Sequence, residues 1–158
     1  MFYFDLDKEF DESKTEDLLN CDVIFLSGGD TRYFLKNLQD RKFISKIQNF
    51  VKNGGVLVGA SAGSILMTPN INITELDHGH NTAKLNDMSA LNLVDFEFYP
   101  HLNWNYDQTL NEIKKYSLIS KSIIYGCEDR DGIIVNNDDI QFYGNVLRIE
   151  NGNITSVG

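Results

Sequence analysis

Hydrophobic residues in the first third of the chain change from the spacing of a strand to the spacing of helices. Residues 22–27 form a short β-branched and aromatic run closed by Gly28-Gly29, which predicts a strand that is buried on both faces and ends in a turn. Asp30-Thr31 then starts a helix. Apolar residues recur at helical spacing over 34–38 and again over 43–51, so two helical segments are expected after this strand.

A second strand follows the two predicted helices. Asn53-Gly54-Gly55 ends the second helical segment, and residues 56–60 form the next buried run, which leads directly into residues 61–67. Strand, helix and strand therefore alternate, and the apolar faces of the helices need a sheet to cover. The pattern predicts an α/β fold with a mostly parallel sheet flanked by helices.

The hydrophobic pattern changes twice in the rest of the chain. Residues 70–92 are polar and weakly periodic, which indicates a long loop or a small excursion over the edge of the sheet. Apolar and acidic residues alternate over 93–99, which predicts a half-exposed strand ending at Pro100-His101, and residues 107–116 are expected to be helical. Strand-like runs with Asn, Asp and Gly turns predict a β-rich, antiparallel C-terminal third, at 123–126, 132–135, 140–143 and 146–157.

Length and charge narrow the classes of protein to which the chain can belong. Its 158 residues, 42% of them hydrophobic, suit one globular domain, placed at 1–158. The formal net charge of −9 repels phosphate backbones and anionic lipids, so neither nucleic acid nor a membrane is an expected partner. No apolar run approaches the about 20 residues of a membrane span, and the N-terminus lacks a secretory signal pattern. We therefore expect a cytoplasmic protein.

No signature of a cofactor or metal is present. Cys21 and Cys127 lie far apart and have no partners at metal-ligand spacing, so both are expected to be inert thiols. Gly28-Gly29 is not a phosphate-binding loop. The sequence therefore predicts a protein that uses neither a cofactor nor a metal.

Gly59-Ala60-Ser61-Ala62-Gly63 is a G-x-S-x-G motif that lies between a predicted strand and an apolar helical segment. In this context the serine occupies a sharp, strained turn that raises its hydroxyl above the sheet, and the flanking glycines avoid clashes. The N–H groups at the start of the helix can stabilise an oxyanion. The structural alternative is a tight turn with glycines chosen for packing alone. The flanking elements favour Ser61 as a nucleophile.

A serine nucleophile requires a base, and the chain has three histidines, His78, His80 and His101. His101 follows Pro100 at the carboxyl end of a predicted strand, where the catalytic groups of open α/β sheets collect. His78 and His80 flank a glycine in the polar middle segment, where a solvated loop is the simpler interpretation. His101 is therefore the expected base.

The third group should be a carboxylate that holds the imidazole in the correct tautomer. Asp129 is well placed just after the predicted strand at 123–126. Glu128 and Asp131 are neighbours that the sequence leaves open.

Four blocks of the chain together resemble the peptidase E family of serine peptidases. They are 23–31, 59–64 with Pro69 behind it, 99–101 and 129–138, in the order of the family and over most of the chain. The family is similar in fold to class I glutamine amidotransferases, which implies a flavodoxin-like arrangement. It uses a serine, a histidine and an acidic residue, which correspond by motif to Ser61, His101 and Asp129.

The resemblance also implies an oxyanion site. The glycine pair after the preceding strand places one donor at Gly28 or Gly29, and the Ala62 amide would be the second, with Asp30 beside them in the substrate-binding region. A strand-ending turn is the structural alternative for the glycine pair. For the acid, the family pattern also leaves open Glu75 and Asp77 downstream of the elbow.

Three features depart from the family pattern: the N-terminus, the helix after the histidine, and Asp30. Family members begin with additional strand and helix units before the block that starts here at Phe2-Tyr3-Phe4, so N-terminal βα units are expected to be missing. Members that cleave dipeptides with an N-terminal aspartate carry an arginine in the helix after the histidine, whereas that helix here offers only Lys114 and Lys115. Lysine lacks the planar fork of arginine, so aspartyl specificity is not implied.

The leading hypothesis is a serine-type peptidase that hydrolyses small peptides. The first alternative is a truncated, inactive relative that acts as a binding or assembly module, since the shortened sheet would leave apolar surface that a homodimer could close. Asp30, in place of the asparagine of the family's Gly-Gly-Asn block, resembles the cyanophycinases, which hydrolyse an aspartate-arginine polymer. An anionic pocket of that kind favours a basic substrate group. An amidotransferase is a weaker alternative, because that chemistry ordinarily places cysteine at the elbow.

Overall fold

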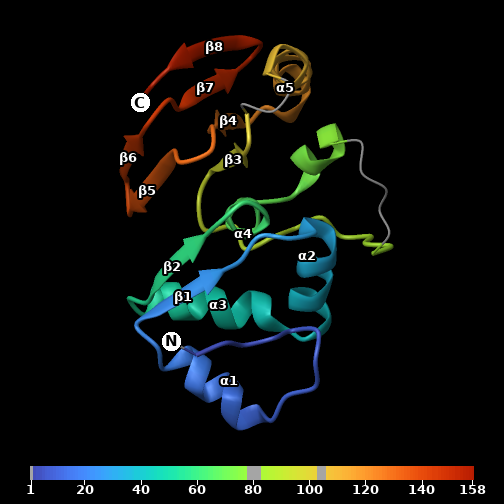
Figure 1. Cartoon of the computed structure of the whole chain (residues 1–158), viewed down its shortest axis with the longest axis vertical. Helices are drawn as coiled ribbons and strands as arrows, with labels where there is room; N and C mark the ends of the chain where they lie inside the picture. The colour runs from blue at the N-terminus through green and yellow to red at the C-terminus, as the bar shows by residue number, and fades with distance from the viewer. Residues whose placement is uncertain (1, 78–82, 103–105) are drawn as a thin grey trace.

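The computed structural model describes residues 2–77, 83–102 and 106–158. The first part of the chain forms one half of the molecule and the last part forms the other, with α4 between them (Figure 1). The N-terminal half contains α1 (Glu12–Leu19), β1 (Val23–Leu26), α2 (Thr31–Asp40), α3 (Phe43–Lys52) and β2 (Val56–Gly59). Next come α4 (Ala62–Ile65) and the 3-10 helix η1 (Asn72–Asp77). The C-terminal half contains β3 (Phe96–Tyr99), α5 (Tyr106–Ser120), β4 (Ile123–Gly126), β5 (Gly132–Asn136), β6 (Asp139–Tyr143), β7 (Leu147–Glu150) and β8 (Asn153–Ser156).

The pairing of the strands confirms the α/β class. β1 pairs with β2 in parallel, as the alternation of strands and helices predicts. β3 also pairs with β4 in parallel, so the strand expected at 123–126 within the antiparallel third has one parallel and one antiparallel neighbour. The C-terminal third is antiparallel, with β7 between β4 and β8 and with β5 paired to β6. The two parallel pairs belong to separate hydrogen-bonded sheets rather than to one continuous sheet.

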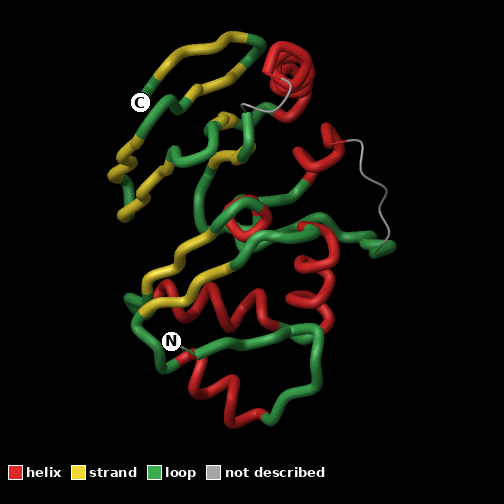
Figure 2. Tube along the Cα trace, viewed as in Figure 1, coloured by secondary structure: helices red, strands yellow, loops and turns green. Residues whose placement is uncertain are grey.

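Most predicted elements occur close to their expected positions. Asp30 caps α2, because its side chain accepts a hydrogen bond from the Tyr33 N–H at 2.9 Å. The polar segment predicted over 70–92 is mainly loop apart from η1 in its described part (Figure 2). Helix α1, which the hydrophobic pattern did not reveal, lies near the N-terminus and is capped by the Asp11 side chain.

The prediction that both early strands are buried on both faces was wrong. Ile24 and Leu26 of β1 face the core, which they share with Phe43, Ile47 and Phe50 of α3. The opposite face of the two strands remains exposed at four apolar side chains, Val23 (53%), Phe25 (62%), Val56 (54%) and Val58 (41%). The register pairs Val23 with Val56 and Phe25 with Val58, so these side chains form one continuous strip. Alternation along a strand places them away from α3, and no described element covers them.

Strand β3 differs from the expected half-exposed strand at its acidic residue. Glu97 is only 1% exposed, because α5 packs over it and the Tyr116 hydroxyl donates a hydrogen bond of 2.7 Å to its carboxylate. The alternating pattern predicts that Glu97 is hydrogen-bonded to water. In the structure the Tyr116 hydroxyl takes the place of that water.

The helical segment after the elbow is shorter than expected. α4 spans only Ala62–Ile65, and Pro69 follows Thr68 soon after its end. Proline disfavours a helical conformation in the residue before it and donates no N–H, so the helix stops within one turn. Among the residues that the structure describes, no helix has both the length and the apolar composition that crossing a bilayer requires.

Candidate active site

Ser61 lies in the turn between β2 and α4. Its backbone has φ 51° and ψ −116°, an unusual conformation for a residue with a side chain. The Ala60 N–H still donates to the Leu26 carbonyl, so the parallel ladder continues up to the residue before Ser61. The chain then turns sharply into α4, as the nucleophile elbow predicted.

Steric crowding explains both glycines of the G-x-S-x-G motif. A Cβ on Gly63 would lie 2.1 Å from the Leu26 carbonyl oxygen, and a Cβ on Gly59 would lie 2.6 Å from the Gly63 backbone. Both distances are far inside van der Waals contact. The elbow therefore requires glycine at both positions in order to bring α4 against β1 and β2.

His101 is brought to the same place by β3 and β4. Tyr99 at the end of β3 is paired with Gly126 at the end of β4. Beyond the strands, the Cys127 N–H donates to the Tyr99 carbonyl and the Leu102 N–H donates to the Cys127 carbonyl, both at 2.9 Å. These bonds hold the segment that contains His101 beside the segment that leads to Asp129.

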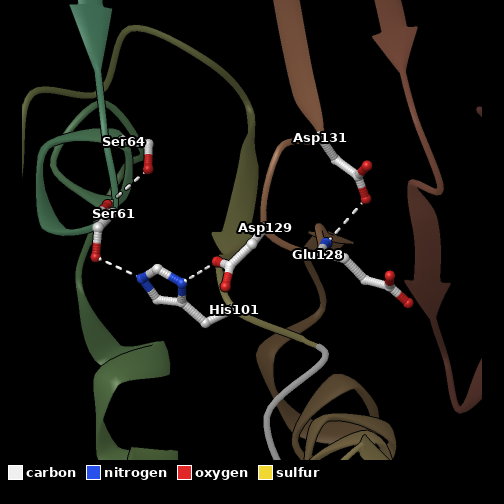
Figure 3. A network of polar contacts seen from close by, with 6 residues as sticks. All are labelled: Ser61, Ser64, His101, Glu128, Asp129 and Asp131. Carbon is white, nitrogen blue, oxygen red and sulfur yellow. Dashed lines mark hydrogen bonds and ion pairs between the residues drawn. The ribbon is translucent and has the colours of Figure 1, made fainter.

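The side chains of Ser61, His101 and Asp129 form a continuous hydrogen-bonded chain (Figure 3). Ser61 Oγ lies 2.8 Å from His101 Nε2, and His101 Nδ1 lies 2.5 Å from Asp129 Oδ1. The side chains of His101 and Asp129 remain 31% and 45% exposed. With a proton on Nδ1, Nε2 accepts the Ser61 hydroxyl proton, so the arrangement can activate a serine.

The other candidate carboxylates contact different groups. Asp131 Oδ2 accepts a hydrogen bond of 2.9 Å from the Glu128 N–H, which stabilises the turn around Asp129 (Figure 3). Glu128 points away from His101 in the same view. Glu75 is exposed on η1, and the adjacent Leu76, rather than Glu75, lines the pocket beside Ser61.

His78 and His80 lie outside the described residues, as does the side chain of Asp77.

The expected oxyanion donors surround the elbow. A Cβ on Gly28 would lie 3.4 Å from Ser61 Cβ, so the turn after β1 lies directly beside the nucleophile. Gly29 has a φ of +138° and lines the same pocket as Ser61. Within the described residues, the Ala62 N–H at the start of α4 donates no hydrogen bond to the protein. Asp30 caps α2 and is not among the described lining residues, so its role in substrate binding stays a prediction.

A pocket of about 390 Å³ opens beside Ser61 and His101. Its walls come from five parts of the fold. The described lining residues are Gly29 and Thr31; Ser61 and Ile65; Ile73, Thr74 and Leu76; Tyr99, Pro100 and His101; and Gln108, Thr109 and Glu112. The combination of aliphatic walls with a few polar groups is typical of a small-molecule site.

The sequence did not reveal the contribution of α5 to this pocket. Glu112 shares one face of the helix with Gln108 and Thr109, because residues three and four positions apart lie close on a helical surface. Their spacing was visible in the sequence, yet a polar helix face is normally exposed to solvent. Lys114 and Lys115 are absent from the described pocket lining.

Neither cysteine forms a disulfide. Burial raises the pKa of the Cys127 thiol to about 12, so it stays protonated and unreactive near neutral pH. In the part of the chain that the structure describes, His, Cys, Asp and Glu side chains form no group that could hold a metal ion.

Comparison with known proteins places this geometry in a family. The model of peptidase family S51 matches residues 5–143. An uncharacterized peptidase from Pasteurella multocida is 31% identical over 134 residues, which cover 83% of this chain and 64% of that protein. A peptidase E from Nostoc is 26% identical, over 89% of this chain and 62% of its own length. The chain thus spans less than two thirds of the length of these relatives.

A solved structure shares the fold. A Listeria monocytogenes protein described as a candidate peptidase E superposes with a TM-score of 0.72 at 24% identity, over 88% of this chain and 67% of the other. The fold agrees with that of a peptidase E candidate, and the family model covers most of the sequence, including Ser61, His101 and Asp129. The chain therefore belongs to peptidase family S51.

Proposed function

We propose that this chain is a serine-type peptidase that hydrolyses small peptides, with Ser61 as nucleophile, His101 as general base and acid, and Asp129 as the group that orients His101. The observation that carries the proposal is the hydrogen-bonded chain from Ser61 Oγ through the imidazole to Asp129 Oδ1. Family membership supports the same reaction class.

The proposed reaction has two halves. In the first, Ser61 Oγ attacks the peptide carbonyl carbon while its proton passes to His101 Nε2. The imidazolium then gives that proton to the leaving nitrogen, the C–N bond breaks and an acyl ester remains on Ser61. In the second half, water attacks the ester with His101 as base, which releases the acid and restores the serine.

Backbone amides are proposed to stabilise the negative oxygen of the tetrahedral intermediates. The Ala62 N–H and an N–H from Gly28 or Gly29 flank the elbow from two sides. Such donors contribute most when they are fixed in place before the reaction, because no reorganisation is then needed as charge develops.

The limited volume of the pocket favours a small substrate. About 390 Å³ lies at the lower end of the range of ligand sites, and it is closed on several sides by η1, β3 and α5. This volume suits a short peptide better than an extended chain.

Covalent capture tests the proposal without knowledge of the substrate. Wild type incubated with a fluorophosphonate should gain the mass of one adduct, measured by intact-mass spectrometry, because an activated serine attacks phosphorus. Ser61→Ala should gain none, and His101→Ala should react at least about 100-fold more slowly, since a general base contributes about 10²–10⁴-fold.

The matched control for this experiment is Ser89→Ala, which removes an exposed serine outside the network and should react like wild type. Circular dichroism establishes that each variant is folded. The proposal fails if folded wild type is not labelled, or if the adduct persists in Ser61→Ala.

One observation favours a second candidate function. The exposed apolar strip on β1 and β2, formed by Val23, Phe25, Val56 and Val58, is the kind of surface that proteins use for association. A non-catalytic family member acting as a binding or assembly module would use this strip and leave Ser61 unreactive. The same labelling experiment distinguishes the two functions.

A further inference from the structure

We propose that Asp131 is a positioning residue, which holds the turn that carries Asp129 so that the Asp129 carboxylate meets His101. The same side chain joins this turn to Gly144, at the end of the hairpin that β5 and β6 form. The inference rests on the proposed function for its consequence in catalysis. Its physical content, the contact between Asp129 and His101, can be measured whether or not Ser61 is reactive.

Residue 131 closes the turn after β4 in two ways. The Asp131 N–H donates to the Glu128 carbonyl at 3.2 Å, and the Asp131 side chain accepts a hydrogen bond of 2.9 Å from the Glu128 N–H. These bonds connect the two ends of the turn, so Asp129 lies within a closed segment of chain. A short polar side chain that bonds to nearby backbone stabilises a turn in this way.

The backbone inside this turn is strained. Arg130 has a φ of 82°, a value that residues with a side chain rarely adopt unless surrounding structure holds them there. Figure 3 shows that Asp129 points to His101, whereas Asp131 points away from the imidazole. Without the bond to the Glu128 N–H, the turn could relax and move the Asp129 carboxylate away from the imidazole.

Gly144 leaves open the space that the Asp131 carboxylate occupies. Gly144 follows β6 with a φ of +91°, and a Cβ on it would lie 2.6 Å from Asp131 Cγ, far inside van der Waals contact. The carboxylate therefore packs against bare backbone at the end of the hairpin. The turn that carries Asp129 is thus held between the Glu128 backbone after β4 and Gly144 after β6.

Variants of Asp131 test this role through the rate of fluorophosphonate labelling. Asp131→Ala removes the acceptor and should slow labelling about 10- to 100-fold, because a displacement of about 1 Å at a site can cost about 100-fold. Asp131→Asn loses the same charge but keeps an oxygen that can accept from the Glu128 N–H, so it should label within about three-fold of wild type. The matched control is Asp138→Ala, which removes an exposed carboxylate from the turn between β5 and β6 and should label at the wild-type rate.

A double-mutant cycle separates positioning from a general loss of structure. Asp129→Asn combined with Asp131→Ala should label as slowly as Asp129→Asn alone, because no carboxylate is left for Asp131 to position. A general loss of structure would instead multiply the effects of the two substitutions.

An NMR signal reports the same contact without the reaction. In the Ser61→Ala protein, the proton between His101 Nδ1 and Asp129 should give a resonance far downfield, because it lies in a short hydrogen bond to a carboxylate. Asp129→Asn assigns the resonance by removing it. Asp131→Ala should also remove it, and Asp131→Asn should keep it.

Gly144→Ala tests the link to the hairpin. The added methyl group should displace the Asp131 carboxylate and act like Asp131→Ala in both measurements. Gly152→Ala is its matched control, because Gly152 also has a positive φ, of +74°, but a Cβ there would lie closest to the flexible Leu118 side chain. This control strains the backbone and leaves Asp131 in place, so it should label at the wild-type rate.

Several results would overturn the inference. They are labelling of folded Asp131→Ala or Gly144→Ala at the wild-type rate, an Asp131→Asn variant as slow as Asp131→Ala, and full multiplication of effects in the double variant. A downfield resonance that persists in Asp131→Ala would do the same. Labelled wild type with Asp131→Ala unaffected refutes only this inference. Unlabelled wild type whose resonance depends on Asp131 as expected refutes only the proposed reaction.

Discussion

Ser61 and His101 both have a left-handed backbone, with φ of 51° and 60°. Residues with a side chain rarely adopt such values unless surrounding structure holds them there. Gly59 and Gly63 allow α4 to approach the strands closely on either side of Ser61, and the bonds between Cys127 and its neighbours hold the segment that carries His101. The two residues with a strained backbone are therefore the two whose side chains are joined by the hydrogen bond between Ser61 Oγ and His101 Nε2.

Asp129 is expected to matter for reactivity, whereas Glu128 is not. Asp129→Asn keeps the size of the side chain but removes the charge, which favours the imidazole tautomer that cannot accept the serine proton. The rate of fluorophosphonate labelling should fall by at least about 100-fold. Changing the acid of a catalytic triad to its amide lowers kcat by about 10⁴-fold, which sets the upper end of the expected loss. Intact-mass spectrometry of samples quenched at successive times measures the rate of labelling.

Glu128→Gln is the control for this prediction. It removes a charge from the adjacent residue, whose side chain points away from His101 (Figure 3). It should label at the wild-type rate. Equal slowing in both variants would instead indicate a general effect of charge near the site.

At the scale of elements, helix α5 and strand β3 are joined by a buried polar contact. The Tyr116 hydroxyl donates to Glu97 Oε2, and burial raises the pKa of Glu97 above its usual 4.5, although the hydrogen bonds from Tyr116 and Ser122 oppose this shift. The contact connects two elements of the pocket, since β3 leads to His101 and α5 carries Glu112. A carboxyl in this position should make folding sensitive to pH.

Glu97→Gln should change the pH dependence of stability. The pKa of Glu97 is higher in the folded protein than in the unfolded chain. Between a pH near the usual value of 4.5 and a pH equal to the raised pKa, the folded protein therefore binds more protons than the unfolded chain. The free energy of unfolding of wild type therefore decreases as pH rises through this window. The variant lacks this group, so its stability relative to wild type should increase with pH in urea titrations.

The control for Glu97→Gln is Glu16→Gln, an exposed glutamate on α1 for which no such trend is expected. Tyr116→Phe adds a second measurement, because it leaves the buried carboxyl with one donor fewer and should cost about 1–3 kcal/mol. A constant difference between wild type and Glu97→Gln at all pH values would contradict the assignment.

On the scale of the whole molecule, the two halves meet at the site, while an apolar strip remains open elsewhere. The ends of β2 and β3 bring Ser61 and His101 together, whereas Val23, Phe25, Val56 and Val58 face outward on β1 and β2. Exposed apolar surface of this kind is unfavourable in water unless a partner covers it.

We propose that a second copy of the chain covers this strip. Phe25→Lys with Val58→Lys should then shift the protein from dimer to monomer in size-exclusion chromatography with light scattering, because two charges per copy would have to be desolvated on association. Ile119→Lys, which places one charge at an exposed apolar residue of α5, should leave the dimer intact. A wild type that is monomeric at every concentration would contradict the proposal.

The sequence by itself determined the order of most elements and the candidate nucleophile. Apolar spacing located β1, β2, α2, α3 and the C-terminal strands, because period and turn residues are local properties of the chain. Ser61 could be predicted as the nucleophile because the two glycines of the G-x-S-x-G motif are visible in the sequence. Both positions lie so close to neighbouring backbone that a larger residue would clash. His101 was favoured because it follows the carboxyl end of a strand, where the catalytic groups of open α/β sheets collect. Asp129 was favoured because it follows the strand predicted at 123–126.

Only the tertiary structure decided which faces are covered and which distant groups meet. Local periodicity cannot tell whether a partner lies opposite, so Val23 and Val56 were expected to be buried and Glu97 to be exposed, and the reverse is observed. The choice of Asp129 over its acidic neighbours depends on the direction of one side chain in a turn. The place of Glu112 in the pocket depends on how α5 packs, since burial and contact between distant residues are properties of the assembled fold.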